Sequence, residues 1–261
     1  MEIKFFQADA FASKPFQGNQ AGVCILEDEI PEQLMQQIAM ENNIAETAFV
    51  FKTNDGFNLR WFTPTVEIML CGHGTLGTSH ILWQEGLLTE NETARFHTKS
   101  GLLTAVKNGD WIEMDFPALF SKPAELEREA INALGVNPLS ICFADRYIIE
   151  LESEAEVRNA EPNFSILKDY ETMVLTSRSD AGSQYDFVSR TFVPKHGIDE
   201  DPVTGSSHCA LLPYWSEKLN KEEFFAYQAS SRGGEVKLKS KGDRVMLCGQ
   251  AITVLQGTLF V

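Results

Sequence analysis

The 261-residue sequence predicts an α/β (α+β) protein of two pseudo-symmetric domains, each a curved mixed sheet or barrel around a central helix. Three observations predict this fold. The two halves have similar sequence segments in the same order. Matching segments alternate apolar and polar residues as half-buried strands do, and each half has a Gly-rich turn followed by an apolar helix-compatible run.

The internal repeat is the first of these observations. Three matches occur in the same order at offsets of 128 to 133 residues: RWFTP at 60–64 with RTFVP at 190–194, GTSH at 77–80 with GSSH at 205–208, and Gly101 with Gly234 together with the turns that follow them. Similar strand-turn-helix units can arise by chance, but three ordered matches favour a duplicated α/β domain.

The elements of each half follow one pattern. Residues 57–62 and 187–192 alternate as half-buried strands and end at a proline, and residues 75–84 and 207–219 are helix-compatible runs that are apolar on nearly every face. Helices apolar all round are usually buried, so each sheet is expected to wrap around its helix.

Other segments complete the two domains. Residues 31–41 begin with proline and carry apolar residues at helical spacing, which predicts an amphipathic outer helix, and residues 106–111 and 238–244 are expected to form hairpins. The alternating segment 251–261 is expected to return to the first domain. The predicted boundaries are therefore 1–116 plus 250–261, and 117–249.

Composition excludes several classes of protein. There are 37 acidic and 22 basic residues, for a net charge of −15, which disfavours nucleic acid and anionic membranes as partners. No apolar run reaches the length of a spanning helix, and the first residues do not resemble a signal peptide, so a cytoplasmic protein is expected. Five scattered cysteines without a CxxC pair predict reduced thiols and no metal site.

Each Gly-rich turn opens a helix whose first amides lack intrahelical partners. If the two turns face one another across a cleft, they would cradle an anion. Neither turn matches a P-loop or a dinucleotide fingerprint, so a small carboxylate is the preferred ligand class.

Three ionisable residues stand in or near these motifs. His73 lies between two glycines, which favours a functional role. Asp201 precedes a proline, where capping or turn formation is the alternative. Glu46 interrupts an apolar stretch, so it lies either on a solvent-exposed face or in a site where desolvation raises its pKa towards that of a useful acid or base.

The motifs together resemble the phenazine-biosynthesis-like isomerase family, a relative of diaminopimelate epimerase. The resemblance spans essentially the whole chain. It is carried by five segments in order: GNQAGV at 18–23, AETAF at 45–49, RWFTP at 60–64, CGHGT at 71–75 and EDPVTGS at 200–206.

The resemblance implies a diaminopimelate epimerase-like fold with its active site between the domains, and a homodimer. It implies that Glu46 is the acid/base carboxylate and that His73 and Asp201 assist proton transfer or hold the substrate. The groups that it implies for substrate binding are Asn19, Gly72, Gly74, Gly205 and Ser206.

Two departures from the family pattern stand out. Gln20 replaces a proline that the family usually has, which alters the rigidity of that loop. The related epimerases use two cysteines as paired bases. Here Cys71 lies in the first motif but the second contains Asp201, and Cys209 is displaced into the helix, so a two-thiol racemase is disfavoured.

The sequence therefore predicts a cofactor-independent isomerase that moves a proton on a small carboxylate-bearing, amino- or hydroxy-acid-like substrate. The alternatives are an amino-acid epimerase or racemase using Cys71, a non-catalytic small-acid binding protein, and a thiol hydrolase built on Cys71 and His73. The hydrolase is the weakest because adjacent turn positions do not ensure that side chains converge.

Overall fold

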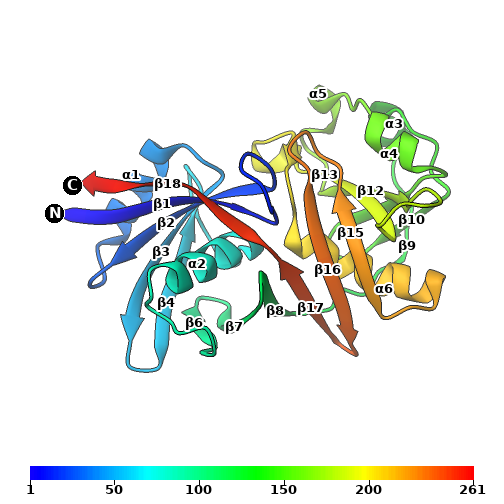
Figure 1. Cartoon of the computed structure of the whole chain (residues 1–261). Helices are drawn as coiled ribbons and strands as arrows, with labels where there is room; N and C mark the ends of the chain where they lie inside the picture. The colour runs from blue at the N-terminus through cyan, green and yellow to red at the C-terminus, as the bar shows by residue number, and fades with distance from the viewer. The chain divides into compact units, whose positions relative to one another are not determined.

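The computed structural model describes all 261 residues as two compact units (Figure 1). Unit 1 comprises Met1–Asp115 and Cys248–Val261, and unit 2 comprises Phe116–Leu247. No helix in the structure is both long enough and apolar enough to cross a lipid bilayer.

Unit 1 contains a mixed sheet and two helices. Its strands are β1 (Glu2–Ala10), β2 (Asn19–Leu26), β3 (Glu46–Thr53), β4 (Gly56–Phe62), β5 (Glu67–Ile68), β6 (Ala94–Thr98), β7 (Gly101–Asn108), β8 (Trp111–Pro117) and β18 (Ala251–Phe260). Its helices are α1 (Glu32–Asn42) and α2 (Gly72–Gln84). The final strand, β18, pairs antiparallel with β1.

Unit 2 contains the remaining elements. Its strands are β9 (Lys122–Pro123), β10 (Ser140–Phe143), β11 (Tyr147–Glu150), β12 (Met173–Arg178), β13 (Phe187–Phe192), β14 (Glu200–Asp201), β15 (Glu223–Gln228), β16 (Gly234–Lys241) and β17 (Arg244–Gly249). Its α-helices are α3 (Arg128–Leu134), α4 (Glu154–Asn159), α5 (Phe164–Leu167) and α6 (Gly205–Leu219), and a 3-10 turn, η1, covers Pro194–His196.

The strand pairings of the two units repeat. In unit 1, β1–β2 is antiparallel, β2–β3 parallel, β3–β4 antiparallel, β4–β6 parallel and β6–β7 antiparallel. Unit 2 shows the same alternation through β10–β11, β11–β12, β12–β13, β13–β15 and β15–β16. This shared order confirms the predicted pseudo-symmetric fold.

Apolar burial explains where the helices lie. In α2, ten of the thirteen residues are buried, and this helix contacts β1, β2, β3 and β18. Trp215 of α6 stacks on Phe187 of β13, with ring centroids 5.7 Å apart. The outer helix α1 instead buries one stripe, Met35, Ile38 and Ala39, against a core that includes Phe49.

The register of the repeat differs from one of the three sequence matches. Cys71 precedes the first residue of α2 and Thr204 precedes the first residue of α6, an offset of 133. The GTSH–GSSH match at 128 is therefore wrong by five residues, since 77–80 lies inside α2 whereas 205–208 opens α6. Small residues occur in several turns of both buried helices, so a four-residue match does not determine how the two helices align.

Candidate functional site

A tight turn places Asn19 at the start of β2. Gly18 has a φ of +65°, and a Cβ there would lie 2.1 Å from the carbonyl oxygen of Ala10, so only glycine fits. Glu46 begins the neighbouring strand, β3, and pairs in register with Ala21 of β2. The adjacent strand starts therefore bring Asn19 and Glu46 to the same edge.

His73 lies between these two side chains. Its Nε2 is 2.7 Å from Glu46 Oε2, and its Nδ1 is 3.2 Å from Asn19 Nδ2. His73 is buried, whereas 18% of the Glu46 side chain remains exposed. Glu46 Oε2 is itself buried against His73, so the exposed part of the carboxylate that a ligand can reach lies on the rest of the side chain.

The Asn19 amide can form a hydrogen bond with His73 in either protonation state of the imidazole. With Asn19 Nδ2 donating to Nδ1, the imidazole is neutral and its Nε2–H faces Glu46. In the imidazolium both ring nitrogens donate, so a rotated amide would present its oxygen to Nδ1. Rotation of one amide therefore accommodates proton uptake.

The charges around His73 favour its protonated form. Burial alone favours the neutral imidazole, whereas an ionised Cys71 sulfur and the Glu46 carboxylate oppose burial and raise the pKa of His73 above its ordinary value. Burial also raises the pKa of the Cys71 thiol. With that thiol protonated, the neighbour that favours the imidazolium form of His73 is the Glu46 carboxylate, 2.7 Å away.

Cys71 has a structural role at the start of α2. Its Sγ accepts a hydrogen bond from Gly74 N at 3.2 Å and caps the helix. The same sulfur lies 3.7 Å from both ring nitrogens of His73, so it is aligned with neither. The cysteine and histidine converge, but the thiol is neutral and already engaged.

Glu46, Cys71 and His73 also form a set of possible metal ligands, with ligand atoms all within 4.8 Å of one another. Tetrahedral zinc with bonds of roughly 2.0–2.1 Å separates neighbouring N and O ligands by about 3.4 Å. The 2.7 Å contact between His73 and Glu46 is too short for both atoms to bind one ion. Their spacing suits proton sharing instead.

In unit 2, a hydrogen-bonded turn leads from Asp201 to α6. Asp201 Oδ2 accepts from Thr204 Oγ1 at 2.6 Å. The buried Gln228 side chain accepts from Thr204 N at 2.9 Å and donates to the carbonyl oxygen of Asp201 at 2.7 Å. This amide fixes both ends of the turn.

Arg146 lies behind the first turn of α6. Its Nη1 donates to the Ser206 and Ser207 hydroxyls, both at 2.9 Å, while Nε and Nη2 donate to the two oxygens of Asp145 at 2.7 and 2.6 Å. Neither Arg146 nor Gln228 follows from the sequence, because each lies far along the chain from the turn that it contacts.

The predicted site residues thus form two groups, each within one unit. Asn19, Glu46, Gly72, His73 and Gly74 gather at the start of α2, and Asp201, Gly205 and Ser206 gather at the start of α6. The amide of Gly74 is already bonded to Cys71, which leaves Gly72 and His73 as the uncapped amides of α2.

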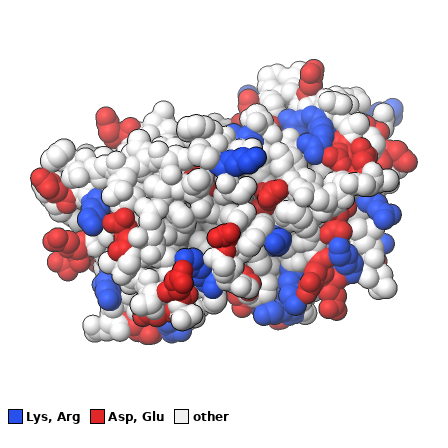
Figure 2. Space-filling view, in the orientation of Figure 1, with Lys and Arg blue, Asp and Glu red and all other residues white.

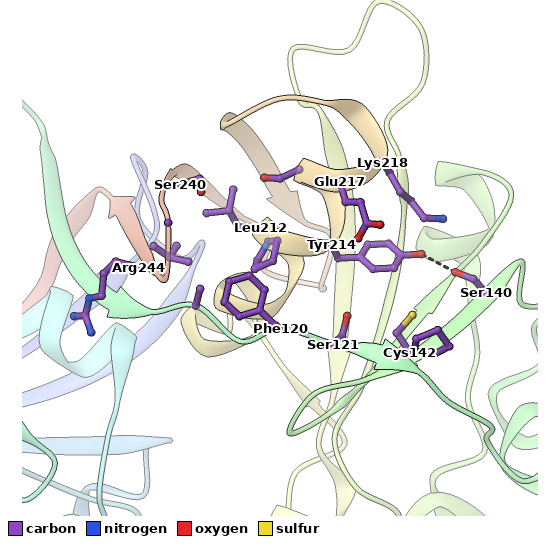
Figure 3. A pocket seen from close by; sticks show the side chains of 16 residues that line it. Phe120, Ser121, Ser140, Cys142, Leu212, Tyr214, Glu217, Lys218, Ser240 and Arg244 are labelled. Carbon is purple, nitrogen blue, oxygen red and sulfur yellow. Dashed lines mark hydrogen bonds between the residues drawn. The ribbon is translucent and has the colours of Figure 1, made fainter.

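Three cavities of about 380 to 650 Å³ lie elsewhere in the two units, and no predicted site residue lines them. The cavity of about 650 Å³ in unit 2 is bordered by Phe120, Cys142 and Tyr214 (Figure 3). In its wall, the Tyr214 hydroxyl lies 2.6 Å from both Ser140 Oγ and Glu150 Oε2. Charged side chains of both signs are interspersed over the face in Figure 2.

A family model, described as phenazine biosynthesis-like protein, matches residues 8–257. The chain belongs to this family. A protein of Halalkalibacterium halodurans named an uncharacterized isomerase is 47% identical over the full length of both chains, and another from Pseudomonas aeruginosa is 42% identical over 99% of each. A solved phenazine biosynthesis protein from Enterococcus faecalis is 39% identical, with a TM-score of 0.96 and complete coverage of both chains.

More distant structures share the fold. A predicted epimerase from Pseudomonas aeruginosa has a TM-score of 0.75 at 21% identity and covers 99% of each chain. This phenazine-biosynthesis-like chain therefore has an epimerase-like fold, as predicted, and its close relatives identify it as an isomerase.

Proposed function

We propose that this isomerase moves a proton on a small, carboxylate-bearing substrate of the amino- or hydroxy-acid kind, without a cofactor. The 2.7 Å contact between His73 and Glu46 supports the proposal most directly. In this contact the Glu46 carboxylate lies against the His73 ring, and 18% of the Glu46 side chain remains exposed for a ligand to contact.

Glu46 is the base of the proposed reaction. Its carboxylate removes a proton from a carbon that an adjacent carboxylate or conjugated system acidifies. The C–H electron pair enters that system as the Glu46 O–H bond forms. Glu46 then returns the proton at another carbon of the substrate, so no redox partner is needed. His73 holds the carboxylate in place and offsets the negative charge.

Unit 2 supplies binding groups in this proposal. The uncapped amides of Gly205 and Ser206 at the start of α6 suit a substrate carboxylate, and Asp201 orients the rest of the molecule. A cyclic hydroxy- or amino-acid such as a dihydro-hydroxyanthranilate is a substrate that the family resemblance suggests.

A carboxylate ligand that contacts both units should protect both Cys71 and the Asp201 turn from labelling or exchange. Protection in one unit only would contradict a shared site.

An epimerase using Cys71 is the second candidate, since its sulfur lies beside His73. Burial disfavours this epimerase mechanism because it keeps the Cys71 thiol protonated.

We also propose a homodimer in the cytoplasm, and a monomeric mass by light scattering would contradict the dimer.

Solvent exchange tests the function. Incubation with a panel of amino and hydroxy acids in heavy water should place deuterium at the reacting carbon. Cys71→Ser should retain most of this exchange. If Cys71→Ser abolishes exchange while Glu46→Gln retains it, the epimerase mechanism replaces the carboxylate one. If wild-type protein exchanges no acid but binds one, it is a binding protein.

A further inference from the structure

Arg146 is a charged residue that is only 9% exposed, and no motif of the family resemblance includes it. It lies between β10 and β11, about sixty residues before the turn that it contacts. Its guanidinium donates hydrogen bonds to the Asp145 carboxylate on one side and to the hydroxyls of Ser206 and Ser207 on the other.

The hydrogen bonds of Arg146 decide what Ser206 can offer to a ligand. Arginine has only donors, so Ser206 Oγ accepts from it, and its own O–H is left to donate elsewhere. Ser207 is fully buried and also accepts from Thr191 Oγ1 at 3.3 Å, which anchors it. Ser206 is half-buried, so its proton can reach a bound molecule.

Arg146 also adds charge to the first turn of α6. No side chain caps this helix, so its first amides present partial positive charge. Asp145 balances Arg146 but has half of its side chain exposed to water. The positive field of Arg146 reaches His208 of α6, whose pKa is lowered mainly by burial and in smaller part by Arg146.

We propose that Arg146 is a positioning residue for the substrate carboxylate. It holds Ser206 with its proton directed to the ligand and supplies the charge that selects a carboxylate over a neutral group. This inference rests on the proposed function, in which Gly205 and Ser206 bind the carboxylate.

Benzoate and its neutral counterpart benzamide serve as probes. Their affinities are measured on the full chain by following the amide NMR signals of Gly205 and Ser206 in wild type, Arg146→Gln, Arg146→Lys, Ser206→Ala and the Arg146→Gln/Ser206→Ala double variant. Arg146→Gln should weaken benzoate binding about tenfold, as expected for a lost charge-assisted contribution, and change benzamide binding little. Arg146→Lys should retain part of the preference for benzoate.

The double variant distinguishes positioning from a general structural effect. If Arg146 acts through Ser206, the combined loss is smaller than the product of the two single losses. Arg158→Gln is the matched control, because Arg158 pairs with Glu154 within α4 and should leave both affinities unchanged. Should Arg146→Gln fail to fold, Ser206→Ala and Arg146→Lys still report the selectivity.

Three results would overturn the inference: benzoate affinity that is unchanged in Arg146→Gln, equal losses for benzoate and benzamide, or no response of the Gly205 and Ser206 signals to benzoate in wild type. The proposed function fails separately, when no acid undergoes solvent exchange. Benzoate selectivity can be measured in either case because it needs no turnover.

Discussion

The starts of α2 and α6 share one backbone arrangement but differ in the side chains around it. Each is a Gly-rich turn at the N-terminus of a buried helix, reached by equivalent strands. The α2 turn is capped by a thiol and lies beside two titratable side chains in contact, Glu46 and His73. The α6 turn is uncapped and held by groups with fixed hydrogen-bonding roles, Gln228 and Arg146.

In the proposed function, this difference assigns proton transfer to the α2 turn and substrate binding to the α6 turn. The two histidines of these helices follow the same division. The Glu46 carboxylate favours the charged form of His73, whereas His208 donates through Nδ1 to the carbonyl oxygen of Thr204 and its burial favours the neutral form. Each of the following predictions tests one side of this contrast.

The largest effect is expected for Glu46→Gln compared with Asp201→Asn. Glutamine keeps the size of the side chain but cannot accept the proton, so turnover should fall by roughly a hundred- to ten-thousandfold with little change in ligand affinity. Asp201→Asn should weaken binding at least as much as turnover. Steady-state kinetics on the acid found by solvent exchange separate the two effects, and a matching loss of affinity in Glu46→Gln would contradict the division between the turns.

Much of this contrast was accessible from sequence, and the rest depended on contacts between distant residues. The internal repeat, the alternation of apolar and polar residues and the apolar helices predict the duplicated fold, and the position of an acid in an apolar stretch indicates Glu46 as a candidate. Short matches did not fix the register, because GTSH and GSSH occupy different turns of their helices. The contact of Arg146 with Ser206 depends on tertiary packing between the β10–β11 turn and α6, which no local pattern encodes.

Acid should destabilise unit 2 through His208. Burial lowers its pKa to about 4, from 6.5 in the unfolded chain. As pH falls from 6.5 to 4, the unfolded state binds a proton that the folded state does not, so the free energy of unfolding decreases across this window by roughly 3 kcal/mol and is unaffected above it. Urea unfolding at both ends of the window measures the change.

The pH-dependent loss should be smaller in His208→Asn, whose amide can still donate to Thr204. His196→Asn is the control, because His196 is exposed. An identical acid dependence in wild type and His208→Asn would show that other groups cause it.

Gly74→Ala should have a moderate effect on unit 1. A Cβ at Gly74 would lie 2.8 Å from Trp61 Cδ1 and 2.9 Å from Cys71 Sγ, so the buried indole or the capping thiol must shift. Overpacking of this kind costs about 1–3 kcal/mol of folding free energy. Gly257→Ala is the control, since a Cβ there meets nothing within 4 Å. Equal unfolding midpoints for both variants in urea would exclude tight packing at the start of α2.

The smallest effect is a change in titration without loss of structure. If the Glu46 carboxylate keeps His73 charged, Glu46→Gln should lower the pKa of His73, because the imidazolium loses its anionic neighbour while burial still opposes its charge. NMR signals of the imidazole ring report this titration, and those of His208 in the same spectra should stay unchanged. Cys71→Ser separates the contribution of the sulfur. If His73 titrates identically in wild type and Glu46→Gln, the carboxylate does not set its charge, and the contrast between the two turns must rest on hydrogen bonding alone.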